Sequence, residues 1–183
     1  MKEGKNTLVF LTGFMGSGKS TIAPIVANTL GYEFLDIDGE IERLIGKSVA
    51  EIFQTEGEEY FRMIERSILR EMSEREGCVI SLGGGTITNV ENLALVKSSG
   101  VLVYLKSTPD QIFKRMKAKT DRPMLLAPDG SRLGRDDLYR RIEVLLAARE
   151  LFYAQADVTI MSDEKRVGAT VDEVVKHIKS LIE

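Results

Sequence analysis

The stretch LVFLTGFMGSGKST, residues 8–21, decides the fold of this chain. An apolar run passes directly into the pattern G-x-x-x-x-G-K-S, residues 13–20, and a helical pattern follows. Glycines in this setting let successive backbone N–H groups turn inward around nucleotide phosphates, and the helix adds its unpaired amides and the positive end of its dipole. The order strand, loop, helix therefore predicts a phosphate-binding loop rather than a glycine-rich turn that binds nothing.

Two side chains at the end of this loop suit nucleotide chemistry. Lys19 is expected to reach the β- and γ-phosphates of ATP, and the hydroxyl of Ser20 to bind Mg²⁺. Pro24 falls inside the following helix, and because it removes one backbone hydrogen bond we predict a local bend or a widened turn there. The predicted nucleotide site consists of Gly13, Met15, Gly16, Ser17, Gly18, Lys19, Ser20 and Thr21.

Five short apolar runs along the chain predict the strands of one sheet. They are rich in β-branched or aliphatic residues, and their near-continuous apolar character is typical of parallel strands buried on both faces. Helical patterns separate them, so we predict βαβ units in a three-layer α/β domain. The runs are residues 7–12, 33–36, 78–82, 101–105 and 157–161.

Helix starts and one long irregular segment can also be read from the sequence. Capping boxes, in which a hydroxyl and an acid or amide three residues later satisfy the first N–H groups, are predicted at residues 48–51, 108–111 and 170–173. Residues 58–74 place apolar side chains on one helical face. Residues 117–137 combine proline and glycine with many charges, and because a connection of this length is usually functional or disordered, we predict a lid.

The composition restricts the class of protein. With 183 residues, 43% hydrophobic and 29% charged, the chain is predicted to form a single globular domain, residues 1–183. Its net charge of −3 argues against a nucleic-acid partner, and no segment approaches the roughly 20 apolar residues that span a bilayer. A lone cysteine, Cys78, excludes an intramolecular disulfide, and a lone histidine, His177, excludes a His-rich metal site. We expect a cytoplasmic monomer without nucleic-acid or membrane partners.

A second group of residues follows the strand ends and extends into later helices. Asp36-Ile37-Asp38 ends the second strand, and Gly83-Gly84-Gly85 follows the third. FRMIE, residues 61–65, lies in the long helix, RPML, residues 122–125, lies in the predicted lid, and Arg149 lies in a late helix. These residues are candidates for binding the molecule that accepts a phosphoryl group.

Taken together, these ordered pieces resemble the shikimate kinase family over roughly residues 8–178. The matching segments are LTGFMGSGKST, FLDID, SVAEIF, FRMIE, SLGGG, RPML and ARELFY, in the family's order. The resemblance implies phosphorylation of the 3-hydroxyl of shikimate with MgATP, in aromatic amino-acid biosynthesis. It also implies a fold like that of nucleoside monophosphate kinases: a five-stranded parallel sheet in the order 2-3-1-4-5, substrate-binding helices at about residues 38–75, and a closing lid.

The resemblance implies a role for each charged residue on the acceptor side. Arg62 and Arg149 would clamp the shikimate carboxylate, a bidentate task that suits guanidinium. Asp38 would accept hydrogen bonds from the ring hydroxyls and could take the proton of the attacking one, while Asp36 would hold the hydration shell of Mg²⁺. Asp38 is also better placed than Asp36 to cap the helix predicted at residues 40–45, and each aspartate could serve both purposes.

Glycine and aromatic residues are expected to shape the acceptor pocket. Gly83, Gly84 and Gly85 allow positive φ angles and close ligand approach. The resemblance brings their amides near shikimate, and Gly83 near the γ-phosphate. Phe53 and Phe61 match apolar positions that flank the shikimate pocket, although either could be plain core.

Four further side chains are assigned by the resemblance or by helical spacing. Arg122 would swing in with the lid and meet the transferring phosphoryl group, and Arg115 matches an arginine that stacks on adenine. Glu65 is expected to orient Arg62, because the two lie three residues apart on one helix face. The family often has a proline against adenine after the last strand, and this chain has Val167 near that place.

Two other interpretations remain open. A kinase of gluconate or of nucleoside monophosphates would share the loop and the architecture, but such kinases lack the DID, FR and GGG segments together. A nucleotide-dependent regulator is the alternative outside the enzymes. A GTPase-type switch would need an N-K-x-D motif, which this sequence lacks, and a kinase that had lost catalysis would be expected to lose Lys19, Asp38 or a substrate arginine.

Overall fold

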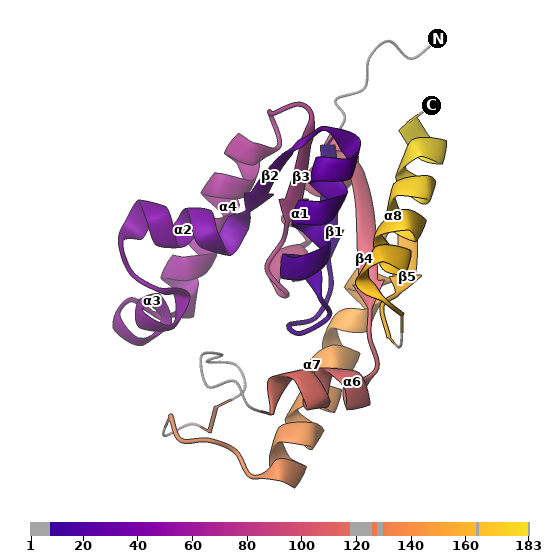
Figure 1. Ribbon diagram of the computed structural model, residues 1–183. Helices are drawn as coiled ribbons and strands as arrows, with labels where there is room; N and C mark the ends of the chain where they lie inside the picture. The colour runs from indigo at the N-terminus through magenta and orange to yellow at the C-terminus, as the bar shows by residue number, and fades with distance from the viewer. Residues whose placement is uncertain (1–7, 118–125, 128–129, 164, 183) are drawn as a thin grey trace.

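The computed structural model describes residues 8–117, 126–127, 130–163 and 165–182. Its five strands form one parallel sheet in the order β2-β3-β1-β4-β5 (Figure 1), as the sequence predicts. Each strand begins and ends within one residue of its predicted run. The strands are β1 (Leu8–Thr12), β2 (Glu33–Asp36), β3 (Cys78–Ser81), β4 (Val101–Lys106) and β5 (Val158–Met161).

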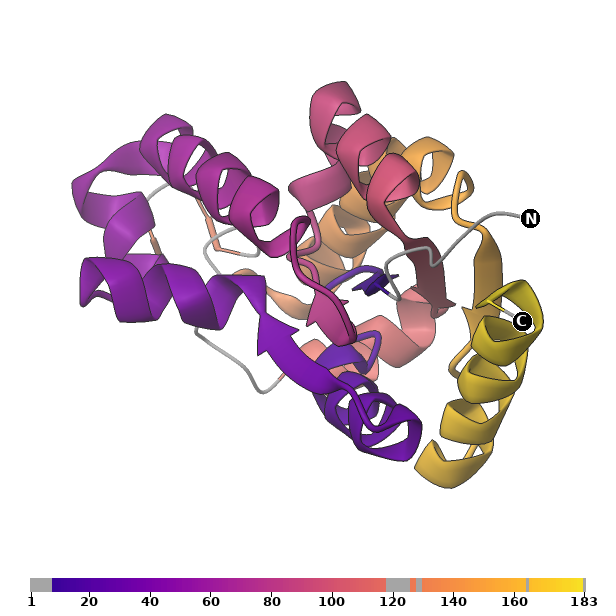
Figure 2. The ribbon, with the colours of Figure 1, turned by 90° about the horizontal axis from the view of Figure 1, so that it is seen from above.

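Helices cover both faces of this sheet. Viewed from above, α1 and α8 lie on one side of it, and α5 and α7 lie on the other (Figure 2). The described helices are α1 (Lys19–Leu30), α2 (Ile37–Ile45), α3 (Val49–Thr55), α4 (Gly57–Met72), α5 (Val90–Ser99), α6 (Pro109–Met116), α7 (Arg135–Tyr153), α8 (Val167–Ile182) and the short 3-10 turn η1 (Thr86–Thr88). None of them is long and apolar enough to cross a membrane.

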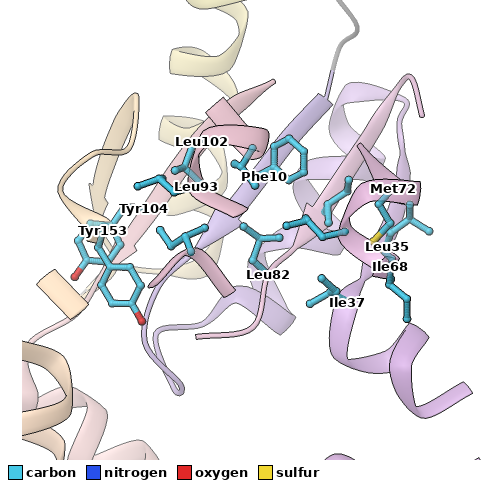
Figure 3. Close-up of a cluster of buried hydrophobic side chains, with 14 of the residues drawn as sticks. Phe10, Leu35, Ile37, Ile68, Met72, Leu82, Leu93, Leu102, Tyr104 and Tyr153 are labelled. Atoms are coloured by element: carbon cyan, nitrogen blue, oxygen red, sulfur yellow. The ribbon is translucent and has the colours of Figure 1, made fainter. Parts of the chain in front are cut away.

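Side chains of the central strand β1 pack against the helices on both faces of the sheet. Leu8 and Phe10 belong to a buried cluster with side chains of α4, α5 and α7, part of which Figure 3 shows around Phe10. Val9 and Leu11, which point to the opposite face, pack with side chains of α1 and α8. All four are fully buried, and burying such a side chain stabilises the fold by about 1.5–3 kcal/mol.

The start of α2 corrects one expectation. The helix begins at Ile37, directly after β2, and Asp36 is its cap: Oδ1 of Asp36 accepts a hydrogen bond from the N–H of Gly39 at 2.9 Å. The expectation that Asp38 caps this helix is wrong, because the helix starts three residues earlier than predicted and Asp38 lies inside its first turn. The strand end thus passes into a helix without a loop.

The capping box at residues 48–51 is confirmed. Ser48 Oγ accepts from the N–H of Glu51 at 3.3 Å, and the Glu51 carboxylate accepts from the N–H of Ser48 at 2.8 Å. At the start of α6 the Thr108 hydroxyl accepts a hydrogen bond from the N–H of Gln111 at 3.4 Å. The Thr108 N–H, however, donates to Asp163 at 2.7 Å instead of to the side chain of Gln111. The second box is therefore only half formed.

Three other expectations about helices need correction. The prediction of a capping box at residues 170–173 is wrong, because α8 begins at Val167 and Thr170 is buried inside the helix. Pro24 lies in an α-helix that is continuous from Lys19 to Leu30, so the prediction of a widened turn at Pro24 is wrong. The alternative, a local bend of the helix, stays a prediction. The last residues of the predicted lid are helical, because α7 begins at Arg135.

Candidate active site

One large cleft, of about 980 Å³, opens at the carboxyl ends of the strands, where ligands of open parallel sheets bind. It contains the predicted site residues that the structure describes, with the exception of Gly13, which is buried. Arg122 lies outside the described residues. The predicted residues that line the cleft are Met15, Gly16, Ser17, Gly18, Lys19, Ser20, Thr21, Asp36, Asp38, Phe53, Phe61, Arg62, Gly83, Gly84, Gly85, Arg115 and Arg149.

The phosphate loop follows β1 and depends on glycine for its conformation. Gly13, Gly16 and Gly18 have φ angles of 147°, 79° and 105°, a region that other residues rarely adopt. Gly13 is also closely packed, because a Cβ there would stand 2.6 Å from the backbone oxygen of Leu105. Only glycine fits this position, and the loop is thereby held against β4.

Lys19 is folded back onto its own loop. Its Nζ donates to the carbonyl oxygens of Gly13 at 2.6 Å and Phe14 at 3.2 Å. The ammonium group therefore sits over the loop, at the start of α1, where the helix N-terminus also favours negative charge. The arrangement concentrates positive charge where phosphates are expected.

The residues expected to hold a metal ion fit Mg²⁺. The hydroxyl of Ser20 and the carboxylate of Asp36 both line the cleft, and Asp36 uses only Oδ1 as a helix cap. Among the described residues no group of three or more acidic, His or Cys side chains could hold a metal. Mg²⁺ needs no such cage, because it commonly binds through one or two carboxylates, waters and substrate phosphates.

Arg62 is held in place by two carboxylates of its own helix. Its Nη1 donates to Glu65 Oε2 at 2.9 Å, and its Nε and Nη2 donate to Glu58 Oε1 at 3.3 and 3.2 Å. The prediction that Glu65 contacts Arg62 is confirmed. Burial lowers the pKa of the Arg62 guanidinium, but Glu65 and then Glu58 raise it by more, so the pKa lies above its ordinary value and the group stays charged.

The Gly83-Gly84-Gly85 turn lies among the charged groups of the site. A Cβ on Gly83 would be 3.1 Å from Asp38 Oδ1, and one on Gly85 would be 2.6 Å from Arg62 Nη2. One on Gly84 would be 3.3 Å from Arg149 Nη1. The expected close approach of a ligand stays a prediction, and the expected positive φ angles are wrong, because none of the three residues has one. These glycines make room for side chains instead.

Arg149 is buried, and its guanidinium group lies near both the Gly83-Gly84-Gly85 turn and Phe14 of the phosphate loop. Its guanidinium carbon stands 5.4 Å from the centroid of the Phe14 ring, within the range of a cation–π contact. Tyr153, one turn later on α7, donates from its hydroxyl to the Gly84 carbonyl at 2.5 Å. Burial raises the pKa of Tyr153 to about 12, despite the opposing effect of Arg149, so the phenol remains a donor. Figure 3 shows its ring beside that of Tyr104.

One end of the cleft is lined by α6 and by the segment between β5 and α8. Arg115 Nη1 donates to the Gly16 carbonyl at 2.9 Å, which brings this arginine against the phosphate loop. The buried Ser162 donates from Oγ to the Ser17 carbonyl at 2.9 Å, a link that the sequence analysis missed. Val167 is half exposed and lines the cleft, in the region where the resemblance expects an adenine contact.

Two aromatic residues line the acceptor side. The rings of Phe53 and Phe61 are tilted with centroids 4.9 Å apart, and Phe61 is buried in the core cluster. Phe53 is only partly buried, and both border the cleft. The site residues that sequence reasoning missed are Thr86 and Ser162, whose hydroxyls are distant in sequence from the groups they contact. Cys78 is buried and His177 is exposed, as expected.

A phosphate loop, an acid and two oriented arginines in one cleft define the class of the protein: an ATP-dependent kinase that acts on a small molecule. Comparison with known proteins narrows this class. The model of the shikimate kinase family matches residues 15–179. Shikimate kinase from Chlorobaculum tepidum is 47% identical over 174 residues, which cover 95% of this chain and 91% of the relative. The chain belongs to the shikimate kinase family.

Solved structures agree with this assignment. Shikimate kinase from Acinetobacter baumannii in complex with shikimate is 32% identical, with a TM-score of 0.87 over 96% of this chain and 94% of that one. Shikimate kinase from Aquifex aeolicus is 31% identical, with a TM-score of 0.78 over 96% and 98%. A gluconokinase from Sinorhizobium meliloti shares only the fold, at 16% identity and a TM-score of 0.58 over 97% and 94%.

Proposed function

We propose that the two halves of this cleft carry out the family's reaction, transfer of the γ-phosphoryl group of ATP to the 3-hydroxyl of shikimate. The observation that best supports these assignments is the glycine turn after β3. Gly83, Gly84 and Gly85 lie against Asp38, Arg149 and Arg62 respectively. Gly84 also lies against the phosphate loop, where its Cβ position is 3.5 Å from Met15 N. The predicted acceptor groups therefore lie along one glycine turn, which itself approaches the phosphate loop.

In the proposed complex, Arg62 and Arg149 bind the carboxylate of shikimate. Glu65 and the ring of Phe14 hold the two guanidinium groups before substrate arrives. Groups ordered in advance lose less conformational entropy on binding, so more of the interaction energy appears as affinity. Phe53 and Phe61 border the ring of the substrate, and the amides of the glycine turn complete the pocket.

The transfer then needs positioning and charge stabilisation more than covalent chemistry. The oxygen of the 3-hydroxyl attacks the γ-phosphorus, the bond from this phosphorus to the bridging oxygen breaks, and ADP leaves. Asp38 accepts the proton of the attacking hydroxyl. Lys19 exchanges its loop carbonyls for the β- and γ-phosphates, and Gly83 lies near the γ-phosphate. When Mg²⁺ is bound by Ser20 and the hydration shell held by Asp36, it neutralises charge on the phosphates.

The remaining assignments concern the nucleotide end and the setting of the enzyme. We assign Arg115 to adenine and Arg122 to the transferring phosphoryl group, with residues 117–137 as a lid that excludes water. Residues 38–75 form the substrate-binding part of a single domain. A net charge of −3 supports the absence of a nucleic-acid partner, and a single cysteine supports a cytoplasmic location. We also propose a monomer without membrane partners.

A coupled assay of ADP release tests the proposal. Shikimate, gluconate and nucleoside monophosphates are offered as acceptors, and only shikimate is expected to give rapid turnover. Arg62→Ala is expected to raise the KM for shikimate by about 10- to 100-fold, the cost of a charge-assisted contact. Arg70→Ala, on an exposed part of the same helix, is the matched control and should keep the wild-type KM. Equal effects of the two substitutions would refute the assignment of Arg62.

A further inference from the structure

The two carboxylates that hold Arg62 differ in burial. Glu65 is almost fully buried, with 1% of its side chain exposed, whereas 53% of the Glu58 side chain is exposed. Glu65 uses one oxygen for Arg62 Nη1, and Glu58 accepts from both Nε and Nη2 with a single oxygen, Oε1. The same arginine therefore has one partner in the protein interior and one exposed to solvent.

The buried partner is fixed. The second oxygen of Glu65 accepts from the hydroxyl of Thr86 at 2.6 Å, and the Thr86 carbonyl accepts from Asn92 Nδ2 at 2.9 Å. Thr86 is fully buried at the end of the glycine turn. A buried carboxylate that lost these contacts would have no water to replace them, so Glu65 stays in place whether or not substrate is bound.

The exposed partner is easily replaced. Exposed ion pairs contribute little to stability, because water solvates both groups when the pair opens. The Nε and Nη2 groups that Glu58 occupies form one edge of the guanidinium, and such an edge can bind a carboxylate through two parallel hydrogen bonds. Glu58 thus occupies a position that the carboxylate of an acceptor molecule could take.

Charge balance points the same way. Arg62 supplies one positive charge, and Glu58 and Glu65 supply two negative charges, so the group of three carries a net charge of −1. With Arg149 beside the same glycine turn, the four charges cancel, and an anionic acceptor added to this set would make its net charge −1. If Glu58 leaves as the acceptor enters, one carboxylate replaces another and the balance does not change.

We propose that Glu58 competes with the carboxylate of the substrate for Arg62. Glu58 pairs with Arg62 in the empty site and is displaced when shikimate binds. The inference rests on the proposed role of Arg62 in binding shikimate. It makes Glu58 a determinant of affinity, since each binding event includes the opening of the Glu58 pair. Glu65 and Thr86 keep Arg62 oriented during the exchange.

The test compares Glu58→Gln with Glu59→Gln. Both glutamates are exposed and lie in the first turn of α4, but only Glu58 contacts Arg62 in the described structure. Glu58→Gln is expected to lower the KM for shikimate, and the Kd measured by calorimetry without ATP, about two- to fivefold, the range that corresponds to one exposed ion pair. Glu59→Gln is expected to leave both constants at the wild-type value.

A neutral acceptor separates competition from a structural role. For methyl shikimate, which has no carboxylate charge, the wild type and Glu58→Gln are expected to have the same Kd. An unchanged or higher Kd of Glu58→Gln for shikimate would overturn the inference, as would an equal gain with the ester. Arg62→Ala tests the underlying assignment separately: if it keeps the wild-type Kd for shikimate, the proposed function of Arg62 fails as well.

Discussion

The nucleotide half and the acceptor half of the cleft are built in different ways. The phosphate loop is eight consecutive residues, 13–20, and its binding groups are mainly backbone amides. The acceptor half takes side chains from α2, α3, α4 and α7 and one turn after β3. A contiguous motif of this kind can occur in many different proteins, so it indicates only that a nucleotide is bound. Side chains that come from several helices are brought together only by the whole fold, so they indicate which acceptor is bound.

The glycines of the two halves show the same contrast. Gly13, Gly16 and Gly18 have positive φ angles, so the backbone itself requires glycine there. The three glycines after β3 have ordinary backbone angles, and a side chain there would collide with Arg62 or crowd Asp38 and Arg149. Substitutions in the first group should therefore affect folding of the loop, whereas those in the second should affect the positions of side chains.

The largest effect is expected from removal of the loop ammonium. Lys19→Met should lower kcat by about 10²- to 10³-fold, because a fixed positive group on the transferring phosphoryl is lost. The KM for shikimate should change little, since Lys19 belongs to the nucleotide half. Steady-state kinetics with each substrate varied in turn measures both. A comparable rise in the KM for shikimate would show that the two halves are not separable.

A smaller effect is expected on the acceptor side. Arg149→Lys keeps the charge but loses the planar fork and the contact with the Phe14 ring. We expect the KM for shikimate to rise about 10- to 100-fold, while the KM for ATP stays within a factor of two to three. A Kd titration with shikimate alone is the check, and retention of wild-type affinity would remove Arg149 from the acceptor site.

The contrast between the glycines gives a paired test. Gly13→Ala places a residue with a φ of 147° against the Leu105 carbonyl and should lower the free energy of unfolding by about 1–3 kcal/mol or more. Gly85→Ala should preserve stability better but displace Arg62, with a roughly tenfold rise in the KM for shikimate. Urea denaturation and kinetics of both variants measure the two effects, and an exchange of the two phenotypes would contradict the interpretation.

The smallest effect concerns pH. The pKa of Tyr153 is raised to about 12 by burial, above its ordinary value near 10. Its contribution to stability is fully present below pH 10 and is lost as the pH rises through 12. Unfolding free energies of wild type and Tyr153→Phe, measured from pH 8 to 12, should show a steeper decline in the wild type above pH 10. If the unfolding free energies of the two proteins fell in parallel above pH 10, the conclusion that Tyr153 is a buried neutral phenol would be contradicted.

The sequence predicted the sheet well, because buried parallel strands are continuous apolar runs. It failed where a helix start depends on neighbours: Asp36 caps α2 because β2 ends without a loop, and α8 begins ahead of the hydroxyl of Thr170 that would have capped it. The phosphate loop was predictable because its residues are contiguous. The acceptor residues needed a family resemblance, since no spacing rule relates Arg62 to Arg149.

Other features could not be found from the sequence because they depend on tertiary packing. Thr86 contacts Glu65 across 21 residues, and Ser162 contacts the phosphate loop across 145. The run of three glycines was recognised, but its reason was misjudged, because a sequence does not say whether glycine serves a backbone angle or a neighbouring side chain. Arg122 and most of the predicted lid remain predictions.

The dispersed acceptor site is tested most directly by shikimate-dependent ADP release of wild type, Asp38→Asn and Arg62→Ala, assayed side by side at saturating ATP. We predict rapid turnover in the wild type and a loss of about 10²- to 10⁴-fold in Asp38→Asn, which lacks the proton acceptor. Arg62→Ala should approach the wild-type rate only at much higher shikimate concentrations. Wild-type kinetics in both variants would contradict the account, even though the chain would still belong to its family.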